Sequence, residues 1–340
     1  MNAIALRKDE FVGTQAEGSE DKLPNASETT VEDAAAPATR PERALPFGIK
    51  LPSGRDAFDA LWPPLAGIGG FLMFWALLAP LVQTSLGTLP GPGDVWAAFL
   101  GLLDEAAASR AAAQEAAAAG YAYTGPPTFI DQIFTSLETV AAGFTLATLF
   151  AVPLGLVAGM SKRVNAAINP LVQVMRPVSP LAWLPIVTMV VSASVTSDDP
   201  TLAKSFIISA VVVMLCSLWP TLINTAIGTA SIDKDLIAVG RVLRLGWFAK
   251  LRRLVLPSAL PYIFTGMRLS LGTGWMVLIA AEMLAQNPGL GKFVWDEFQN
   301  GSEKSLARIM VAVVVIGLIG FALDRMMMAL QAIVSRNRAV

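Results

Sequence analysis

The stretch DLIAVGRVLRLGWFAKLRRLVLPSALP, residues 235–261, lies between two long apolar runs and differs from both. Its apolar residues recur at steps of three and four, which is typical of one face of a helix. These residues are Leu236, Val239, Leu243, Trp247, Leu251 and Leu254. Gly246 predicts a turn between two short helices. Pro257 has the position of a first-turn proline, and with Pro261 it restarts the chain into the next apolar run.

The basic segment, which we define as residues 233–257, has three possible roles on pattern alone. Basic amphipathic helices often lie among lipid headgroups. Cations between two membrane spans also arise simply as the signal that orients a membrane protein. A short helix with an apolar ridge can instead dock into a groove on a partner protein. The pattern leaves all three roles open.

Composition places the chain in a membrane. Of its 340 residues, 54% are apolar and only 15% are charged, whereas soluble domains carry about 25% charged residues. The net charge of −1 gives no indication of nucleic acid as a partner. Histidine, the commonest general base and metal ligand, does not occur, and the single cysteine, Cys216, cannot form an intrachain disulfide. A membrane enzyme would need another arrangement, such as Ser–Lys, which composition does not exclude.

Six apolar segments predict the fold class. A helix that crosses a bilayer needs about 20 mostly apolar residues. The candidate spans lie within residues 60–93, 139–161, 180–195, 206–232, 262–285 and 306–330. The predicted fold is therefore all-α and integral to the membrane, with about six transmembrane helices. Residues 104–120 are rich in alanine and predict a surface helix between the first two spans.

The distribution of cations predicts the orientation. The loops after the second and fourth spans carry more lysine and arginine than the loops on the other side. The positive-inside rule then places the basic segment and both termini in the cytoplasm. Residues 1–58 are rich in Ala, Glu, Asp, Ser, Thr and Pro and predict a disordered cytoplasmic tail. Residues 59–340 form the predicted membrane domain.

The third span is rich in proline. Pro180 and Pro185 each remove a backbone donor, and Pro170 and Pro177 lie just before them, so a broken helix is expected. Broken backbone inside a bilayer persists where it is buried in protein or lines a cavity. We therefore assign Pro180, Trp183 and Pro185 either to the wall of a translocation path or to a kinked structural helix, and the sequence does not separate the two.

The fifth span carries small and ionisable residues. Gly266, Ser270 and Gly274 follow each other at steps of four, a spacing that lets two helices approach closely, either within the chain or across a dimer. Arg268 and Glu282 are ionisable, which makes each a candidate site inside a membrane. Arg268 could attract an anion, but its place near one end of the span favours a structural role, and Glu282 is interpreted as hydrogen-bonded structure.

The basic segment resembles the EAA loop of ABC-transporter inner-membrane permeases, whose motif is roughly E-A-A-x3-G followed downstream by L-P. Leu256-Pro257 matches the closing pair. Counting back, Asp235-Leu236 matches the acidic opening and Val239-Gly240 the small-residue pair. Arg244 falls on the glycine of the family, which is a departure, and Gly246 is then the candidate to supply the turn.

The rest of the chain is similar to one group of these permeases, over residues 60–335. The similarity rests on LAWLP, WPTLINTAIG, VLPSALPYIFTGMRLSLGTGW, AAEML and GLGKFVWDEFQN, which look like permeases of the nitrate/taurine importer group. VLRL in the basic segment together with VWDEFQN is most similar to the branch for nitrate, nitrite, cyanate and bicarbonate. The resemblance implies the type I ABC importer permease fold in a bacterial inner membrane.

The resemblance also implies a mechanism and partners. The chain has no G-x-x-x-x-G-K-[ST] phosphate-binding loop, so ATP and magnesium would be bound by cytoplasmic ABC ATPase subunits and no cofactor or metal by this chain. Two copies would form the pathway, and a periplasmic or lipid-tethered solute-binding protein would deliver the solute. The residues expected to couple the ATPase are Asp235, Leu236, Val239, Gly240, Leu243, Arg244, Gly246, Leu256 and Pro257.

The predicted function is thus a permease subunit, not an enzyme, that carries a small anion. Nitrate or nitrite is the first expectation, and cyanate or bicarbonate the next. A permease for taurine or another aliphatic sulfonate would share the same sequence pattern. A secondary transporter driven by an ion gradient is a different class, and it leaves the basic segment unexplained.

Overall fold

The computed structural model describes residues 54–84, 87–195, 203–302 and 304–336. Contacts between Cα atoms divide the chain into residues 1–59 and 60–340, and the elements below belong to the second unit except for the first turns of α1. The predicted tail, residues 1–58, lies outside the described residues up to residue 53, so it stays a prediction. Helix α1 already begins at Gly54, inside the range assigned to the tail.

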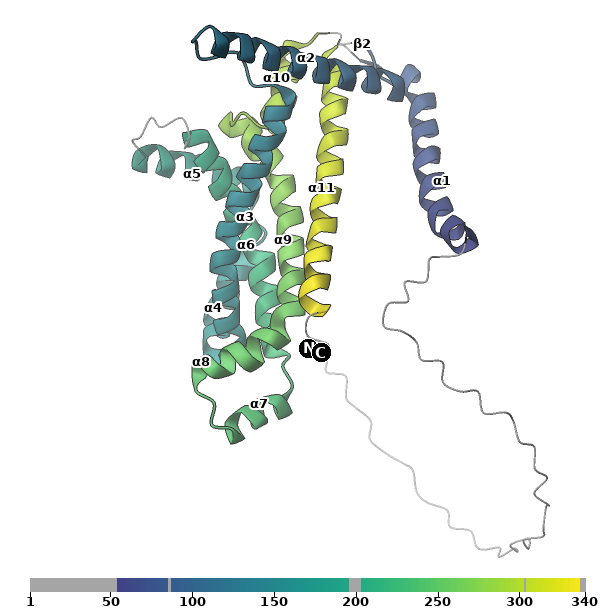
Figure 1. Ribbon diagram of the computed structural model, residues 1–340. Helices are drawn as coiled ribbons and strands as arrows, with labels where there is room; N and C mark the ends of the chain where they lie inside the picture. The colour runs from purple at the N-terminus through teal and green to yellow at the C-terminus, as the bar shows by residue number, and fades with distance from the viewer. Residues whose placement is uncertain (1–53, 85–86, 196–202, 303, 337–340) are drawn as a thin grey trace, which may run out of the picture. The chain divides into compact units, whose positions relative to one another are not determined.

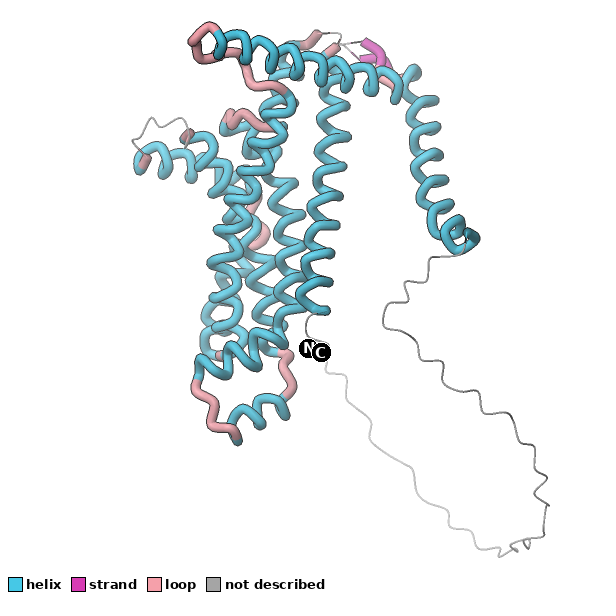
Figure 2. The backbone as a smooth tube through the Cα atoms, in the orientation of Figure 1, coloured by secondary structure: helices cyan, strands magenta, loops and turns pink. Residues whose placement is uncertain are grey.

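The described chain is almost entirely helical (Figures 1 and 2). Its short elements are η1 (Ala79–Leu81), β1 (Gln83–Thr84) and β2 (Gly87–Thr88), the two strands pairing antiparallel. Its helices are α1 (Gly54–Leu78), α2 (Pro92–Ala118), α3 (Phe129–Met160), α4 (Lys162–Met175), α5 (Pro180–Ser194), α6 (Lys204–Ala230), α7 (Lys234–Val242), α8 (Trp247–Lys250), η3 (Leu251–Val255), α9 (Leu256–Ala285), α10 (Leu290–Asn300) and α11 (Ser305–Arg336).

The predicted all-α membrane fold is confirmed. Among the described residues, five helices are long and apolar enough to cross a bilayer, and the pair α4 and α5 would make a sixth span. The five are Leu61–Leu81, Phe129–Met160, Lys204–Ala230, Trp247–Ala285 and Ser305–Val334. Each of the five overlaps one predicted span, and the remaining predicted span, residues 180–195, corresponds to α5.

The expected break in the third span is present. Helices α4 and α5 meet at an angle of 101°. Pro177 lies between the two helices, and Pro180 occupies the first turn of α5, where its missing N–H is tolerated. Pro170 and Pro185, by contrast, lie inside α4 and α5. Only two of the four prolines therefore lie at the break.

The core of the bundle is the packing of α3, α6 and α9, which lie side by side in Figure 1. A glycine allows the close approach of α3 to α6: a Cβ atom on Gly143 would lie 2.6 Å from the backbone oxygen of Ala210. Helices α7 and α8 lie at one end of this bundle, called here the α7–α8 end, and α2 and α10 lie at the other, the α2–α10 end (Figure 1).

Helix α2 is the surface helix expected near residues 104–120, and it starts 12 residues earlier, at Pro92. The backbone N–H of Gly91 donates to the Asp94 carboxylate at 2.9 Å, which caps the helix. Val95, Leu102 and Ala106 form its buried face. Helix α2 thus lies across the α2–α10 end of the bundle, on α11 and α3 (Figure 1).

Candidate functional site

The basic segment folds as two short helices, α7 and α8, followed by one long helix. The side chain of Asp233 accepts a hydrogen bond from the backbone N–H of Asp235 at 2.9 Å and so caps α7. Asp235 lies in the first turn, where a carboxylate interacts favourably with the helix dipole. The acidic opening of the motif therefore starts the helix.

Helix α7 ends in a Schellman motif. The N–H of Leu245 donates to the carbonyl of Gly240 at 3.0 Å, and the N–H of Arg244 donates to the carbonyl of Arg241, also at 3.0 Å. Arg244 occupies the left-handed position of the motif, with φ of 47°. This conformation favours glycine, because a Cβ atom crowds the backbone there. The position at which the family pattern has glycine is therefore a left-handed residue in this chain, although the residue is arginine.

The expected role of Gly246 needs correction. The predicted turn between two short helices exists, but Gly246 has φ of −60° and is the N-cap of α8. A Cβ atom at this position would have no neighbour within 4 Å. The left-handed conformation is at Arg244, so the turn forms without the displaced glycine.

The predicted apolar stripe divides between two faces. Leu236, Leu251 and Leu254 are half-buried, and Leu236 and Leu251 pack against the core cluster at the α7–α8 end. Leu243 is 63% exposed and Trp247 is 61% exposed. With Val239 they form an apolar ridge, together with two residues that the sequence argument missed. The ridge consists of Val239, Val242, Leu243, Trp247 and Phe248.

Sequence analysis missed Val242 and Phe248 because it counted the stripe at a single helical phase across the predicted turn. The turn at Leu243–Gly246 breaks that helix, so the faces of α7 and α8 have to be counted separately. On α7 the exposed side carries Val242, which is 82% exposed. Gly240, on the opposite side, is buried, and a Cβ atom there would lie 2.7 Å from Leu254 Cδ1. Gly240 thus lets α7 lie against the helix that follows α8.

The second part of the basic segment is continuous with a membrane span. Helices α8, η3 and α9 together run from Trp247 to Ala285, and η3 is a π-helical turn. Pro257 lies directly after η3, in the first turn of α9, as expected. In a regular α-helix its ring would clash with the carbonyl four residues earlier, and the wider π turn relieves this contact. Leu256, half-buried, packs on the core at this end.

Helix α5 carries the three residues assigned to the third span. Pro180 begins α5 and Pro185 lies within it. Trp183 is half-buried and packs with Val187, Val191 and their neighbours on α6 and α9. Much of the remaining surface of α5 is exposed and apolar. The structure therefore shows a kinked, partly packed helix, and it does not assign these residues to a path.

The small residues of α9 face α6 of the same chain. Gly266, Ser270 and Gly274 are all buried. The Ser270 hydroxyl accepts from the backbone N–H of Thr221 at 3.1 Å and donates to the backbone oxygen of Ser217. A Cβ atom on Gly266 would lie 2.8 Å from Asn224 Cβ. Of the two arrangements left open by the spacing, the described residues show the one within the chain.

Arg268 makes an ion pair with Asp324 of α11. Its Nε and one terminal nitrogen donate to the two carboxylate oxygens, the latter at 2.9 Å, in a bidentate arrangement. Sequence analysis missed Asp324, because a partner 56 residues away leaves no local signal. The arginine is therefore already paired with an anionic group of its own chain.

Glu282 is fully buried and hydrogen-bonded, in agreement with its structural interpretation. The Ser136 hydroxyl of α3 lies 2.9 and 2.8 Å from its two oxygens. The backbone N–H of Gly291 donates to its Oε2 at 3.0 Å. Glu282 therefore joins α3, α9 and the beginning of α10.

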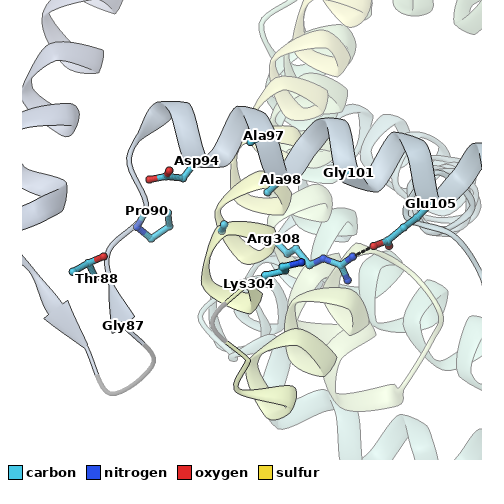
Figure 3. Close-up of a pocket in the computed structure, with 11 residues that line it drawn as sticks. Gly87, Thr88, Pro90, Asp94, Ala97, Ala98, Gly101, Glu105, Lys304 and Arg308 are labelled. Carbon is cyan, nitrogen blue, oxygen red and sulfur yellow. Dashed lines mark hydrogen bonds and ion pairs between the residues drawn. The ribbon is translucent and has the colours of Figure 1, made fainter.

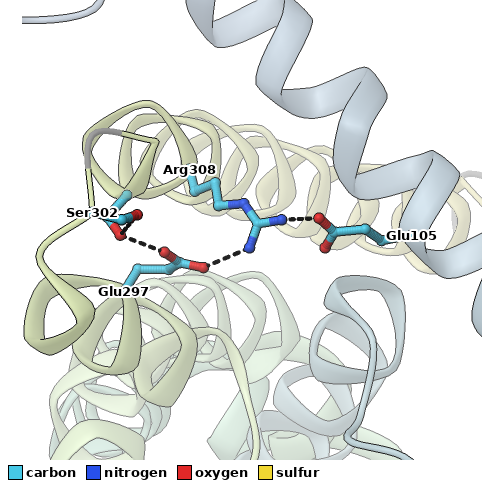
Figure 4. Close-up of polar contacts among 5 residues, drawn as sticks. Glu105, Glu297, Ser302 and Arg308 are labelled. Atoms are coloured by element: carbon cyan, nitrogen blue, oxygen red, sulfur yellow. Dashed lines mark hydrogen bonds and ion pairs between the residues drawn. The ribbon is translucent and has the colours of Figure 1, made fainter.

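A polar cluster that sequence analysis did not find lies where α2, α10 and α11 meet, which we call the Arg308 cluster (Figure 4). The Arg308 guanidinium contacts Glu297 of α10 at 2.9 Å and Glu105 of α2. The Ser305 hydroxyl donates to Glu297 at 2.8 Å and lies 2.8 Å from Ser302 Oγ. Beside it, a cavity of about 660 Å³ is lined by residues of β2, α2 and α11 and by Lys304 just before α11. Asp94, Glu105 and Arg308 are among the lining residues (Figure 3).

An exposed apolar ridge lies at one end of the bundle, attached to a helix that continues through the bundle to the other end. Among the described residues, no group of three or more acidic or cysteine side chains could hold a metal ion.

Comparison with known proteins agrees with this arrangement. The model of the family described as "Binding-protein-dependent transport system inner membrane component" matches residues 151–339, more than half of the chain and all of the basic segment. The chain belongs to this family. Family membership and the helical architecture together support the expected fold, an all-α integral-membrane permease.

Two curated relatives illustrate the similarity. The permease is 35% identical over 300 residues to the bicarbonate transport system permease protein CmpB of Synechococcus elongatus, covering 88% of the permease and 98% of that protein. It is 38% identical over 195 residues to the nitrate import permease protein NrtB of the same species, covering 57% and 66%. A solved amino acid ABC transporter aligns with 62% of the permease and 93% of its own chain, at 15% identity and a TM-score of 0.45.

Proposed function

We propose that the permease is the membrane-spanning subunit of an ATP-driven importer of a small inorganic anion, with nitrate or nitrite and bicarbonate as the leading substrates and cyanate next. Family membership supports the role of importer subunit. The relatives named for bicarbonate and nitrate support the substrate class. Taurine and other aliphatic sulfonates are the alternative substrates, because the nitrate/taurine group shares its permease pattern.

The observation that carries the proposal is the apolar ridge of the basic segment. Five apolar residues of α7 and α8 are at least half exposed, and cations flank them. Exposed apolar clusters often mark protein–protein contacts, and a short amphipathic helix suits a groove on a partner. We infer that the ridge docks on a cytoplasmic ABC ATPase subunit, and the proposed orientation therefore has both termini in the cytoplasm.

The proposed mechanism is rigid-body coupling. Two permease copies form the pathway and each receives one ATPase subunit, which binds ATP and magnesium. Closure of the ATPase dimer moves the docked ridge, and α9 moves with it because residues 247–285 are one helical unit. A periplasmic or tethered binding protein delivers the anion at the α2–α10 end. We expect the permease itself to bind no cofactor.

The paired charges support different roles for the permease and the binding protein. Arg268 is paired with Asp324, and Glu282 is enclosed by Ser136 and Gly291. Neither charge is free to select an anion inside the membrane. We therefore assign most of the substrate selectivity to the binding protein.

Reconstitution tests this function. The permease is expressed with candidate ATPase and binding-protein partners, purified by a tag on the permease and placed in lipid vesicles. We expect the ATPase to co-purify and labelled nitrate or bicarbonate to enter only when ATP and the binding protein are present. Labelled taurine and cyanate are compared at the same concentration. Uptake driven by an ion gradient without ATP would overturn the proposal, and uptake of taurine alone would overturn its substrate class.

A further inference from the structure

The carboxylate of Glu282 is the centre of a buried contact that we call the Glu282 clasp: Glu282, Ser136 and the amides of Leu290 and Gly291. Both Glu282 and Ser136 are fully buried. The Ser136 hydroxyl lies within 2.9 Å of both carboxylate oxygens and also accepts from the N–H of Leu290 at 2.8 Å. Gly291 donates directly to the carboxylate at 3.0 Å. The first two amides of α10 are thus satisfied by α9 and α3.

The turn between α9 and α10 is closed tightly around this carboxylate. A Cβ atom on Gly289 would overlap the Glu282 carboxylate, and one on Gly291 would overlap the backbone oxygen of Ile279. Next to the clasp, the Asn287 amide donates to Thr139 Oγ1 of α3 at 3.2 Å. Helix α10 therefore cannot move at its beginning unless α9 and α3 move with it or the clasp opens.

The same α9 is the far end of the helix that carries part of the ridge. Residues 247–285 form one continuous helical unit of 39 residues, made of α8, η3 and α9. Trp247 begins this unit and Glu282 lies in its last turn. A displacement applied at Trp247 can consequently reach the Glu282 clasp along one continuous run of helix.

Beyond the clasp, α10 leads to α2. Glu297, in the last turns of α10, is buried and holds Arg308, which also contacts Glu105 on α2 (Figure 4). A buried carboxylate therefore fixes α10 near each of its ends. Glu282 of α9 binds its beginning, and Glu297 of α10 itself binds Arg308 near its end. The contacts form a connected series from α9 through α10 to α2, at the end of the bundle remote from α7 and α8 (Figure 1).

We propose that the Glu282 clasp is the remote end of the coupling lever, and that Glu282 and Ser136 are positioning residues that make α10 and α2 move with α9. The inference rests on the proposed function, and it extends that function to the α2–α10 end. Through the clasp, docking of the loaded binding protein on α2 and α10 is transmitted to the ATPase, and ATP binding is transmitted back to α10. The clasp binds no solute.

A graded set of variants tests this role. Ser136→Ala removes the hydroxyl, Ser136→Cys replaces it with a weak donor of similar size, and Glu282→Gln keeps the size but removes the charge. The matched control is Ser209→Ala on α6, because Ser209 is equally buried and its hydroxyl has no hydrogen-bond partner among the described residues. The complex of permease and ATPase is purified in lipid nanodiscs for each variant.

The first readout is ATP hydrolysis with and without solute-loaded binding protein. We expect the ratio of stimulated to basal rate to fall about fivefold or more in Ser136→Ala and Glu282→Gln. This change corresponds to the loss of one buried hydrogen bond. The ratio in Ser136→Cys should lie between these values and the wild-type ratio. Ser209→Ala should keep the wild-type ratio. Wild-type ratios in Ser136→Ala and Glu282→Gln would overturn the proposal.

The second readout is hydrogen exchange of residues 290–300 on addition of a non-hydrolysable ATP analogue. In wild type and Ser209→Ala, nucleotide bound to the ATPase should change the protection of α10. In Ser136→Ala and Ser136→Cys this response should be lost or reduced. An unchanged response would overturn the lever, even where a variant transports poorly. Failure of the proposed function looks different, because the wild-type complex itself would then not assemble or would show no stimulation.

Discussion

At the scale of single residues, the turn of the basic segment shows how a fold keeps a conformation without its preferred residue. Arg244 holds a left-handed φ of 47° at the end of α7, which is unfavourable by about 1–2 kcal/mol for a residue with a Cβ atom. The two hydrogen bonds of the Schellman motif, to Gly240 and Arg241, offset this. The apolar ridge therefore depends on a strained turn.

Arg244→Gly should stabilise the end of α7. Glycine removes the left-handed strain but adds about 0.5–1 kcal/mol of conformational freedom in the unfolded chain, so the net gain is about 0.5–1 kcal/mol. Hydrogen exchange at the amides of Leu243 and Leu245 should slow by roughly twofold to fivefold. Arg241→Ala is the control, because it also removes a cation but at a residue of α7 with helical backbone. Exchange at the same two amides should not slow in this variant. Faster exchange in Arg244→Gly would contradict this account of the turn.

At the scale of elements, α7 and α8 are held to the bundle on one side and open on the other. Leu236 and Leu251 pack on the core, whereas Leu243 is 63% exposed. A change on the open side should therefore affect a partner without disturbing the fold.

Leu243→Asp should reach the membrane and fold, yet lose the ATPase. A charge on the ridge would be desolvated by docking without a counter-ion, so we expect the fraction of ATPase retained on a tagged permease to fall at least tenfold. Leu243→Met keeps an apolar side chain and should retain it. Persisting co-purification and transport in Leu243→Asp would remove the ridge from the contact.

The pair between α9 and α11 gives a second prediction at this scale. Removal of either Arg268 or Asp324 leaves the other charge without its partner on a candidate membrane span, which is unfavourable. We expect Arg268→Ala and Asp324→Ala each to lower the melting temperature of the purified permease, and the double variant to recover most of the loss. Uptake should recover with it. Poor uptake in a double variant of normal stability would instead assign Arg268 to the solute path.

At the scale of the whole molecule, the orientation in the membrane can be measured directly. Cys216 is replaced by alanine, and single cysteines are introduced at Phe248 in α8 and at Gln114 in α2, both exposed. In membranes that contain the permease without its ATPase, a maleimide that does not cross membranes should label residue 248 only from the cytoplasm and residue 114 only from outside. The reverse pattern would remove the basic segment from the ATPase and reject the proposed function.

The sequence predicted what depends on local pattern. Hydropathy located the spans, closely spaced prolines predicted the break between α4 and α5, and alanine content predicted α2. Pairings between distant residues left no such signal: Ser136 and Glu282 are 146 positions apart, and Arg308 and Glu105 are 203 apart. Val242 was missed for a different reason, because the turn after α7 changes the helical phase on which the stripe was counted.

The tight turn around Glu282 also has a consequence for how this part of the chain can change over time. Only a hydrogen atom fits at residue 289, and the hydroxyl at residue 136 serves the same carboxylate. The residue types at positions 136, 282 and 289 therefore depend on one another, although they are separated in the sequence. In related proteins, we expect these three residues to be substituted together or not at all.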